Sequence, residues 1–480
     1  MLISKRAKRF VGARRSAPVT PAGGSRAGGS RAGDSRAGGS RAGGSRTAPT
    51  ALRLWVLALL LLIAACSDAG GETTITEPPP TVAPQITSTP RPATLTPRPP
   101  TVMPRASSTP LSPAATTAAP AQTAIPTLAS TLLADGSARH FLPLGFGASQ
   151  SFWQVFFTAP NGSRSPATYV GGIDIPLAQA LAGVTRTLDI AAFEFNNPVI
   201  TAAVLDAVRR GVAVRIVTDS EHGYEDVDST LKQIEAAGVR IVQDNRAAFM
   251  HNKFMILDGL TVVTGSWNFT VNDTYRNNNN AVFLRSPRVA AVYQAEFNEM
   301  YLLGRFGPSA SLPTSDNRLN IDGVPLEIYF SPDDAVLTRV NEAISSARRS
   351  IRFMAFSFTE DSIGDALISK LEATSSVTVR GIFESTGSET RFSELTRLHC
   401  AGLPDLEVRQ DGGPFVLHHK VFIIDARIVV TGSFNFSANA TDSNDENLIV
   451  IEDPILAAQY VEEFDRRWAE ARAPGVACPS

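Results

Sequence analysis

Apolar and polar positions follow two different periods from about residue 141 to the end of the chain. Short, almost continuous apolar runs predict buried strands, and longer stretches with apolar residues three and four apart predict helices. In the first half, strands are predicted at 152–160, 187–195, 213–219, 240–244 and 279–286, and helices at 174–184, 198–212, 228–239 and 287–304. Strands that alternate with helices indicate an α/β fold with a largely parallel sheet.

The same order of elements recurs in the second half. Strands are predicted at 326–332, 351–360, 377–385, 406–413 and 447–453, and helices at 335–350, 361–373 and 454–472. The polar segment 306–323 is predicted to be a connector. The repeat therefore predicts two duplicated α/β domains, at 139–305 and 324–475.

The N-terminal part predicts export rather than a folded domain. The apolar run from Leu54 to Ala65 is too short to span a bilayer comfortably but suits the core of a signal peptide. Its end, "IAAC", resembles the bacterial lipobox, which implies that Cys66 is lipidated and anchors an exported chain to the bacterial cell membrane. The repetitive stretch before it, as in "GGSRAGGSRAG", is low-complexity sequence, and a translation start nearer Leu52 is an alternative. Residues 1–66 are thus predicted to hold this low-complexity segment and the signal peptide.

A Thr/Pro-rich segment follows at 67–138 and predicts a disordered tether, because it has too few apolar residues to bury a core. The chain has three cysteines. If Cys66 is lipidated, Cys400 and Cys478 remain as a pair that an oxidising compartment would bridge, and two unpaired thiols are the alternative. No Cys/His spacing suggests zinc, so no metal site and no cofactor are predicted.

Charge is segregated along the chain. Residues 1–65 hold 12 of the 44 Lys/Arg and 1 of the 46 Asp/Glu, which leaves 32 basic and 45 acidic residues in the remainder, a net charge of −13. Proteins that hold long nucleic acids through their phosphates usually present a basic face. The acidic remainder argues mildly against that class of partner.

Two strings carry the chemistry: "MHNKFMILDGLTVVTGSWNFT", which starts at Met250, and "LHHKVFIIDARIVVTGSFNFS", which starts at Leu417. Both contain His-x-Lys, four residues, Asp, six residues and then Gly-Ser-aromatic-Asn. The first string supplies His251, Lys253, Asp258, Gly265, Ser266 and Asn268, and the second supplies His418, Lys420, Asp425, Gly432, Ser433 and Asn435. The two histidines lie 167 residues apart, which fits the duplication of a whole domain.

Residues i and i+2 of a strand point to the same face, so each histidine projects together with its lysine, and His419 points away. Lysine, serine and asparagine donors suit phosphate oxygens. An imidazole beside them can act as a nucleophile or a proton donor. Two such half-sites facing each other would place two histidines on opposite sides of one phosphorus.

The doubled motif resembles that of the phospholipase D superfamily, over roughly residues 140–475. The resemblance implies two α/β/α-sandwich halves packed about a pseudo-twofold axis with one shared active site, so that a monomer suffices. It also implies a metal-independent, two-step reaction through a covalent phosphohistidine. On this basis Ser266, Asn268, Ser433 and Asn435 are predicted to bind the phosphate, whereas Asp258 and Asp425 are predicted to be structural.

The two copies differ at one informative position. Glu446 stands where many family members carry a carboxylate behind the histidine, and the equivalent position of the first copy is Asn279. We therefore expect Glu446 to support His418 and to raise its pKa, which makes His418 the general acid and base. His251, without a carboxylate, is expected to be neutral and to act as the nucleophile.

The substrate is less well defined. The predicted function is that of a phosphoric diester hydrolase, and a phospholipid head group is favoured because the acidic chain is expected to be tethered at a membrane. An endonuclease-like phosphodiesterase is the alternative, because the compact catalytic part resembles the small endonuclease-like members. A third reading is a non-catalytic surface module that binds polyanions.

Overall fold

The first half of the chain builds one mixed sheet. The structure, a computed structural model, describes residues 128–308 and 313–478. The first sheet has the strand order β1-β2-β3-β4-β10-β9-β8-β5-β6-β7. Its strands are β1 Ala129–Leu132, β2 Ala138–Leu142, β3 Gly145–Gln150, β4 Trp153–Thr158, β5 Thr187–Ala192, β6 Ala213–Thr218, β7 Ile241–Gln243, β8 Lys253–Leu257, β9 Thr261–Gly265 and β10 Asn280–Arg285. The helices of this half are α2 Asp174–Ala182, α3 Pro198–Arg209, α4 Leu231–Ala236, α5 Val271–Tyr275 and α6 Pro287–Leu303.

The second half repeats this plan with fewer strands at one edge. Its sheet has the order β11-β12-β18-β17-β16-β13-β14-β15. The strands are β11 Arg318–Ile321, β12 Val324–Ser331, β13 Ser350–Ala355, β14 Thr378–Phe383, β15 Leu406–Gln410, β16 Lys420–Ile424, β17 Ile428–Gly432 and β18 Glu446–Glu452. The helices are α7 Val336–Ser346, α8 Asp361–Ala373, α9 Glu394–His399, α10 Ala438–Asp442 and α11 Pro454–Glu470.

The expectation of a largely parallel sheet is wrong. Parallel pairing is confined to β5–β6–β7 in the first sheet and β13–β14–β15 in the second, and the other paired strands run antiparallel. The reason lies in the connections. A helix such as α3, between β5 and β6, allows a parallel crossover, whereas the short turn between β8 and β9 forces a hairpin. The α/β class and the duplication are confirmed.

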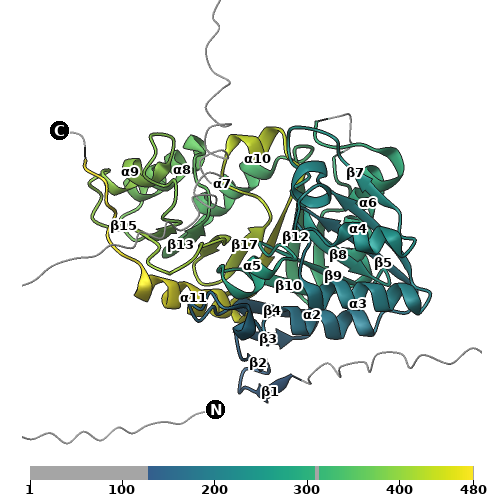
Figure 1. Cartoon of the computed structure of the whole chain (residues 1–480). Helices are drawn as coiled ribbons and strands as arrows, with labels where there is room; N and C mark the ends of the chain where they lie inside the picture. The colour runs from purple at the N-terminus through teal and green to yellow at the C-terminus, as the bar shows by residue number, and fades with distance from the viewer. Residues whose placement is uncertain (1–127, 309–312, 479–480) are drawn as a thin grey trace, which may run out of the picture. The chain divides into compact units, whose positions relative to one another are not determined.

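The two sheets share one central core. On β8, Phe254 and Ile256 point into a cluster that also contains β16 residues and residues of α6 and α11, while Met255 and Leu257 point to the opposite face. That opposite face is covered by α2, α3 and α4, and the equivalent face of the second sheet is covered by α7, α8 and α9. Figure 1 shows α2 and α3 side by side against the first sheet. The helices α6 and α11 therefore lie between the two sheets.

Two predicted boundaries are corrected. The first domain extends further toward the N-terminus than residue 139, because β1 and the start of β2 add to the first sheet within the predicted tether 67–138. The predicted connector 306–323 contains β11, which pairs with β12. The signal peptide, Cys66 and most of the tether lie outside the described residues. Within the described ranges, no helix is both long enough and apolar enough to cross a membrane.

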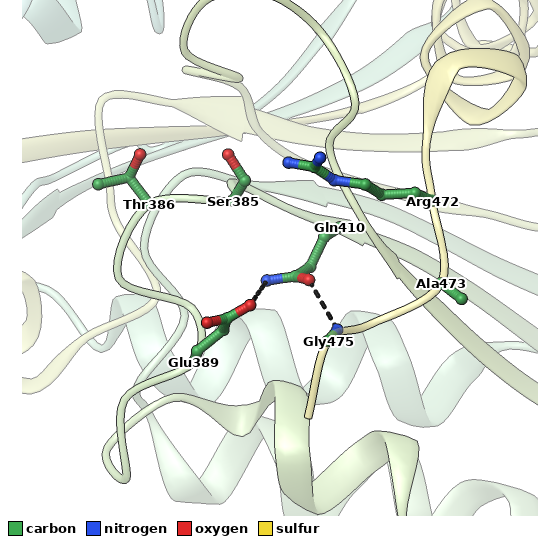
Figure 2. Close-up of a pocket in the computed structure, with 7 residues that line it drawn as sticks. All are labelled: Ser385, Thr386, Glu389, Gln410, Arg472, Ala473 and Gly475. Carbon is green, nitrogen blue, oxygen red and sulfur yellow. Dashed lines mark hydrogen bonds between the residues drawn. The ribbon is translucent and has the colours of Figure 1, made fainter. Parts of the chain in front are cut away.

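The C-terminal tail is bound to the edge of the second sheet by a disulfide and by hydrogen bonds. Cys400 and Cys478 form the predicted disulfide, with their Cα atoms 5.3 Å apart. Gln410 of β15 pairs with Arg472 through two main-chain hydrogen bonds of 2.9 Å. Its side chain accepts from the Gly475 amide at 3.0 Å and donates to Glu389 at 3.2 Å, as Figure 2 shows. These contacts enclose a surface pocket of about 390 Å³ between the tail and the loop that carries Glu389.

Replacing Cys478 by serine is expected to lower the free energy of unfolding by about 2–4 kcal/mol, because the bridge closes a 78-residue loop in the unfolded chain. Chemical denaturation of the variant and the wild type measures the difference. Cys400→Ser should have the same effect, and the double variant should add nothing further. Equal stability of the variants and the wild type would contradict a bridge that stabilises the fold.

Candidate active site

Each catalytic motif begins beside the other half of the chain. The residue before His251 forms an isolated parallel bridge with Asp445, and the residue before His418 forms the same bridge with Asn278. The His251 amide donates to the Asp445 carbonyl at 3.0 Å, and the His418 amide donates to the Asn278 carbonyl at 2.9 Å. These reciprocal main-chain contacts bring the two motifs together in one site.

The two His/Lys pairs have the same local geometry. The Lys253 ammonium donates to the His251 carbonyl at 2.7 Å, and the Lys420 ammonium donates to the His418 carbonyl at 3.0 Å. The His251 ring packs edge-on against Phe193, whose face also lies 4.8 Å from Lys253 Nζ. Phe356 has the same relation to His418 and Lys420. The sequence analysis did not identify either phenylalanine, because a single aromatic residue in a strand is normally part of the core.

The carboxylate of Glu446 does not support His418, so the expectation based on the sequence is wrong. Glu446 Oε2 lies 2.7 Å from Nδ1 of His251, in the other half of the chain. His418 Nδ1 instead contacts Asn279 Oδ1 at 2.9 Å. The physical reason is the reciprocal bridging, which aligns β18 of the second half with the first motif. The lack of a carboxylate therefore no longer supports His251 as the nucleophile, and that assignment stays a prediction.

A second acidic residue, Asp273 of α5, contacts His418. One of its oxygens lies 3.3 Å from His418 Nδ1, and its carboxylate also accepts from the amide of Asn268 at 2.9 Å. The His418 imidazole and these hydrogen bonds hold the pKa of Asp273 well below its usual range, against the effect of burial. The sequence analysis missed Asp273, although the 167-residue offset pairs it with Ala440 and so marks a second difference between the copies.

Burial controls the charges of the two imidazoles. Burial, assisted by Lys253 and Lys420, holds the pKa of His251 well below its ordinary value. Burial also lowers the pKa of His418 to about 4, with Lys420 adding to the effect and Asp273 opposing it. Burial raises the pKa of Glu446 to about 8, although Lys253 opposes this. Both histidines are therefore neutral in the free enzyme near neutral pH.

The environment of the two buried lysines favours the binding of an anion. Each lysine is 1 % exposed, and burial lowers the pKa of Lys253 to about 8 and the pKa of Lys420 well below its usual value. The half-buried carboxyl of Glu194 has a pKa raised to about 7, chiefly by desolvation and by Asp273. A bound phosphate would supply the negative charge that both ammonium groups lack at close range.

The motif serines have a different role from the predicted one. Ser433 Oγ donates to Glu446 at 2.7 Å and accepts from the Asn447 amide, while Ser266 Oγ donates to Asn279 at 2.8 Å and accepts from the Asn280 amide. The serines are fully buried behind the groups that hold the histidines, so they position those groups rather than bind the phosphate.

The motif asparagines stay predicted phosphate ligands. Their side-chain oxygens, in Asn268 and Asn435, are buried and have no hydrogen-bond partner among the described residues. These oxygens are acceptors, so a phosphate would have to bind the side-chain NH2 groups instead.

The remaining motif residues are structural, as expected. Asp258 and Asp425 have left-handed backbone conformations, with φ of 53° and 54°. Their carboxylates accept hydrogen bonds from main-chain amides at the start of β5 and β13, respectively. Gly265 and Gly432 also have positive φ, and a Cβ atom on either would lie within 2.4 Å of a main-chain oxygen on β10 or β18.

The residues between each histidine and lysine bind the two halves together. Asn252 accepts a 2.9 Å hydrogen bond from Asn447, and His419 contacts Asn280 at 3.2 Å. His419 also lies 3.2 Å from Glu463 and is fully buried. This agrees with the prediction that His419 points away from the site.

Comparison with known proteins identifies the family. A family model described as "Cardiolipin synthase, PLD-like domain" matches residues 177–301 and 340–468. The chain belongs to the phospholipase D superfamily. The two matched segments cover both halves, and each includes one His-x-Lys motif of the phospholipase D type.

The relatives that the chain matches include proteins named as lipid hydrolases. A mitochondrial cardiolipin hydrolase of Chlamydomonas reinhardtii is 36% identical over 121 residues, which are 25% of this chain and 54% of that protein. A phospholipase D of Rickettsia bellii is 33% identical over 171 residues, which are 35% of this chain and 83% of that protein. The chain spans about half the length of the mitochondrial cardiolipin hydrolases of Chlamydomonas and Xenopus laevis that it matches.

Among solved structures, the phospholipase D family member Nuc from Salmonella typhimurium is 35% identical with a TM-score of 0.29. The match covers 31% of this chain and 97% of Nuc.

Proposed function

We propose that this protein is a phospholipase D-type phosphodiesterase that hydrolyses a phospholipid at its head group through a covalent phosphohistidine. The observation that carries the proposal is the pair of buried His/Lys motifs, each of which is hydrogen-bonded through its main chain to the other half of the chain. A phosphate between the motifs would meet two ammonium groups and two imidazoles. Binding alone would not require the imidazoles to be oriented through Nδ1.

We propose that His251 attacks phosphorus and that His418 transfers the proton. Glu446 engages Nδ1 of His251, so Nε2 is the nitrogen that can attack phosphorus. As the new N–P bond forms, the bond from phosphorus to the leaving oxygen breaks, and His418 gives a proton to that oxygen. His418 enters this step as imidazolium, because the anionic substrate and Asp273 favour its charged form.

The second step reverses the proton transfer. His418, now neutral, takes a proton from water while the water oxygen attacks phosphorus and the N–P bond breaks. This step regenerates free His251 and releases a phosphate monoester. Lys253 and Lys420 would neutralise the non-bridging oxygens throughout, and Asn268 and Asn435 are the further predicted donors.

Two observations support a lipid substrate. The named activities of the relatives in Chlamydomonas and Rickettsia are lipid hydrolysis. In addition, the chain beyond residue 65 has a net charge of −13, which does not favour long nucleic acids. Lipidation at Cys66 belongs to this proposal, because an acyl anchor would hold the site close to phospholipid.

The first test measures hydrolysis by the full chain in EDTA. We expect release of phosphatidic acid from phosphatidylglycerol or phosphatidylcholine vesicles, with single-stranded DNA and an aryl phosphodiester assayed in parallel. The reaction needs only the side chains named above, so EDTA should leave the rate unchanged. Cleavage of DNA without cleavage of lipid would overturn the choice of substrate, and complete loss of activity in EDTA would overturn the metal-free mechanism.

A further inference from the structure

Glu194 adds a third carboxyl group to the catalytic site, and the proposed mechanism gives it no role. The residue lies between two phenylalanines, and both of them contact the first motif string. Phe193 packs its ring edge-on against His251, and Phe195 forms an isolated parallel bridge with Phe269. Because its two chain neighbours are held in this way, Glu194 lies beside the first motif.

The charge of Glu194 acts on both motif lysines. It favours the charged forms of Lys253 and Lys420, one from each half of the chain, and so opposes the burial that lowers the pKa of each. Lys253 in turn opposes the rise in the pKa of Glu194. Since the two ammonium groups are the proposed ligands of the substrate phosphate, a phosphate bound to them would also experience the charge of Glu194.

The Glu194 carboxyl is free to act on a ligand. The other two carboxyl groups of the site, those of Glu446 and Asp273, each contact a motif histidine. Glu194 forms no hydrogen bond or ion pair with another described residue. It is half-buried, and neither of its carboxyl oxygens is fully enclosed. This carboxyl group is therefore open to solvent rather than engaged in holding the fold.

The equivalent residue of the other half is the uncharged Ser357. Its neighbours repeat the contacts of the first half: Phe356 packs edge-on against the second motif histidine, and Phe358 forms an isolated parallel bridge with Phe436. The same local backbone thus accepts a serine, so the fold itself does not require a glutamate at position 194.

The ionisation of Glu194 is set by burial and by its charged neighbours. These neighbours are Lys253 of β8, Lys420 of β16, Asp273 of α5, Asp219 after β6 and Asp226 before α4. Burial is the largest cause that raises the pKa of Glu194 to about 7, and the three aspartates add to it. The group is therefore negatively charged above about pH 7 and neutral well below it.

The substrate and the product of the proposed reaction differ in charge. A phosphate diester carries one negative charge, whereas a phosphate monoester carries nearly two at neutral or higher pH, because its second pKa is about 6. Coulomb repulsion is proportional to the charge of the ligand, so an ionised Glu194 opposes binding of the monoester more than binding of the diester.

We propose that Glu194 is a specificity-determining residue that repels phosphate monoesters and so promotes release of the product. The inference rests on the proposed function, in which a diester is bound and a monoester is formed. Lys253 and Lys420 bind the monoanionic diester in spite of Glu194, and the additional charge that appears on hydrolysis weakens the binding of the product.

The experiment measures the binding of two small anions to the full chain by isothermal titration calorimetry at pH 8. Dimethyl phosphate serves as the monoanionic diester, and inorganic phosphate serves as the dianion. Glu194→Gln should tighten the binding of dimethyl phosphate by about 5-fold and that of inorganic phosphate by about 25-fold, because the repulsion that is removed doubles with the ligand charge. Inorganic phosphate should also inhibit hydrolysis of the aryl phosphodiester more strongly in the variant than in the wild type.

The effect should depend on pH. Near pH 5.5 Glu194 of the wild type is largely protonated, because its pKa is about 7. Inorganic phosphate is then mainly a monoanion. The dissociation constants of the wild type and of Glu194→Gln should therefore become nearly equal for both anions. A residue that only stabilised the fold would not produce this convergence.

Three further variants sharpen the test. Glu194→Asp keeps the charge and should keep the discrimination between the two anions. Glu194→Ser introduces the residue of the other half and should behave like Glu194→Gln. Ser357→Ala is the matched control at the equivalent position, where no charge is lost, and it should leave both dissociation constants unchanged.

The possible failures are distinguishable. If Glu194→Gln tightens both anions by the same factor, or tightens neither, while lipid hydrolysis continues, the discrimination by Glu194 is wrong and the proposed function stands. A change in binding that is the same near pH 5.5 and at pH 8 would also overturn the inference. Absence of both phosphate binding and hydrolysis in the wild type would overturn the proposed function, and the inference with it.

Discussion

Replacing His251 by alanine is expected to reduce kcat by at least about 10⁴-fold and to prevent formation of any covalent phosphoenzyme, because the attacking nitrogen is lost. Replacing His418 by alanine should reduce kcat for a lipid by about 10²–10⁴-fold, because proton transfer to and from the leaving oxygen is lost. The measurements are steady-state hydrolysis and acid-quenched labelling with a phosphorus-labelled substrate.

An aryl phosphodiester separates the roles of the two histidines. A nitrophenolate leaving group needs no proton, so the His418→Ala variant should release one equivalent rapidly and retain label on His251. Mapping of that label to residue 251 would support the assignment. Label on residue 418 in the His251→Ala variant would show that the nucleophile has been assigned to the wrong half.

Replacing Glu446 by glutamine is expected to reduce kcat by about 10²–10³-fold, because the amide cannot hold His251 with its proton on Nδ1. The pH dependence should change as well. In the wild type, attack requires the ionised carboxylate, and burial raises the pKa of Glu446 to about 8. Therefore kcat/KM for the aryl phosphodiester should rise with pH up to about 8 and fall as acid protonates the carboxyl.

The Glu446→Gln variant should lose this rise, because its amide does not titrate. Asn279→Ala is the matched control, since Asn279 contacts His418 as Glu446 contacts His251. With the aryl substrate, Asn279→Ala should keep the wild-type pH dependence. If the rise near pH 8 persists in Glu446→Gln, another group must be responsible for it.

The sequence predicted the repeated α/β halves and the paired motifs because both depend on local periodicity and spacing. It could not predict which imidazole Glu446 contacts, because that choice depends on how the halves are aligned and not on distance along the chain. For the same reason the sequence analysis did not identify Asp273, which lies in the first half and contacts His418 of the second half. The serines were assigned to phosphate because a hydroxyl donor suits either a phosphate or a buried carboxylate, and only the fold places Ser433 behind Glu446.

Each motif histidine is held by a residue of the other half of the chain. The site can therefore form only after both of these residues have been synthesised. Glu446 follows His251 by 195 residues, so the proposed nucleophile has no carboxylate partner until the ribosome has passed residue 446. His418, in turn, depends on Asp273 and Asn279, which are made long before it. An N-terminal fragment that ends before β18 would therefore carry the first motif without the carboxylate partner of His251, and activity would appear only after β18 has been made.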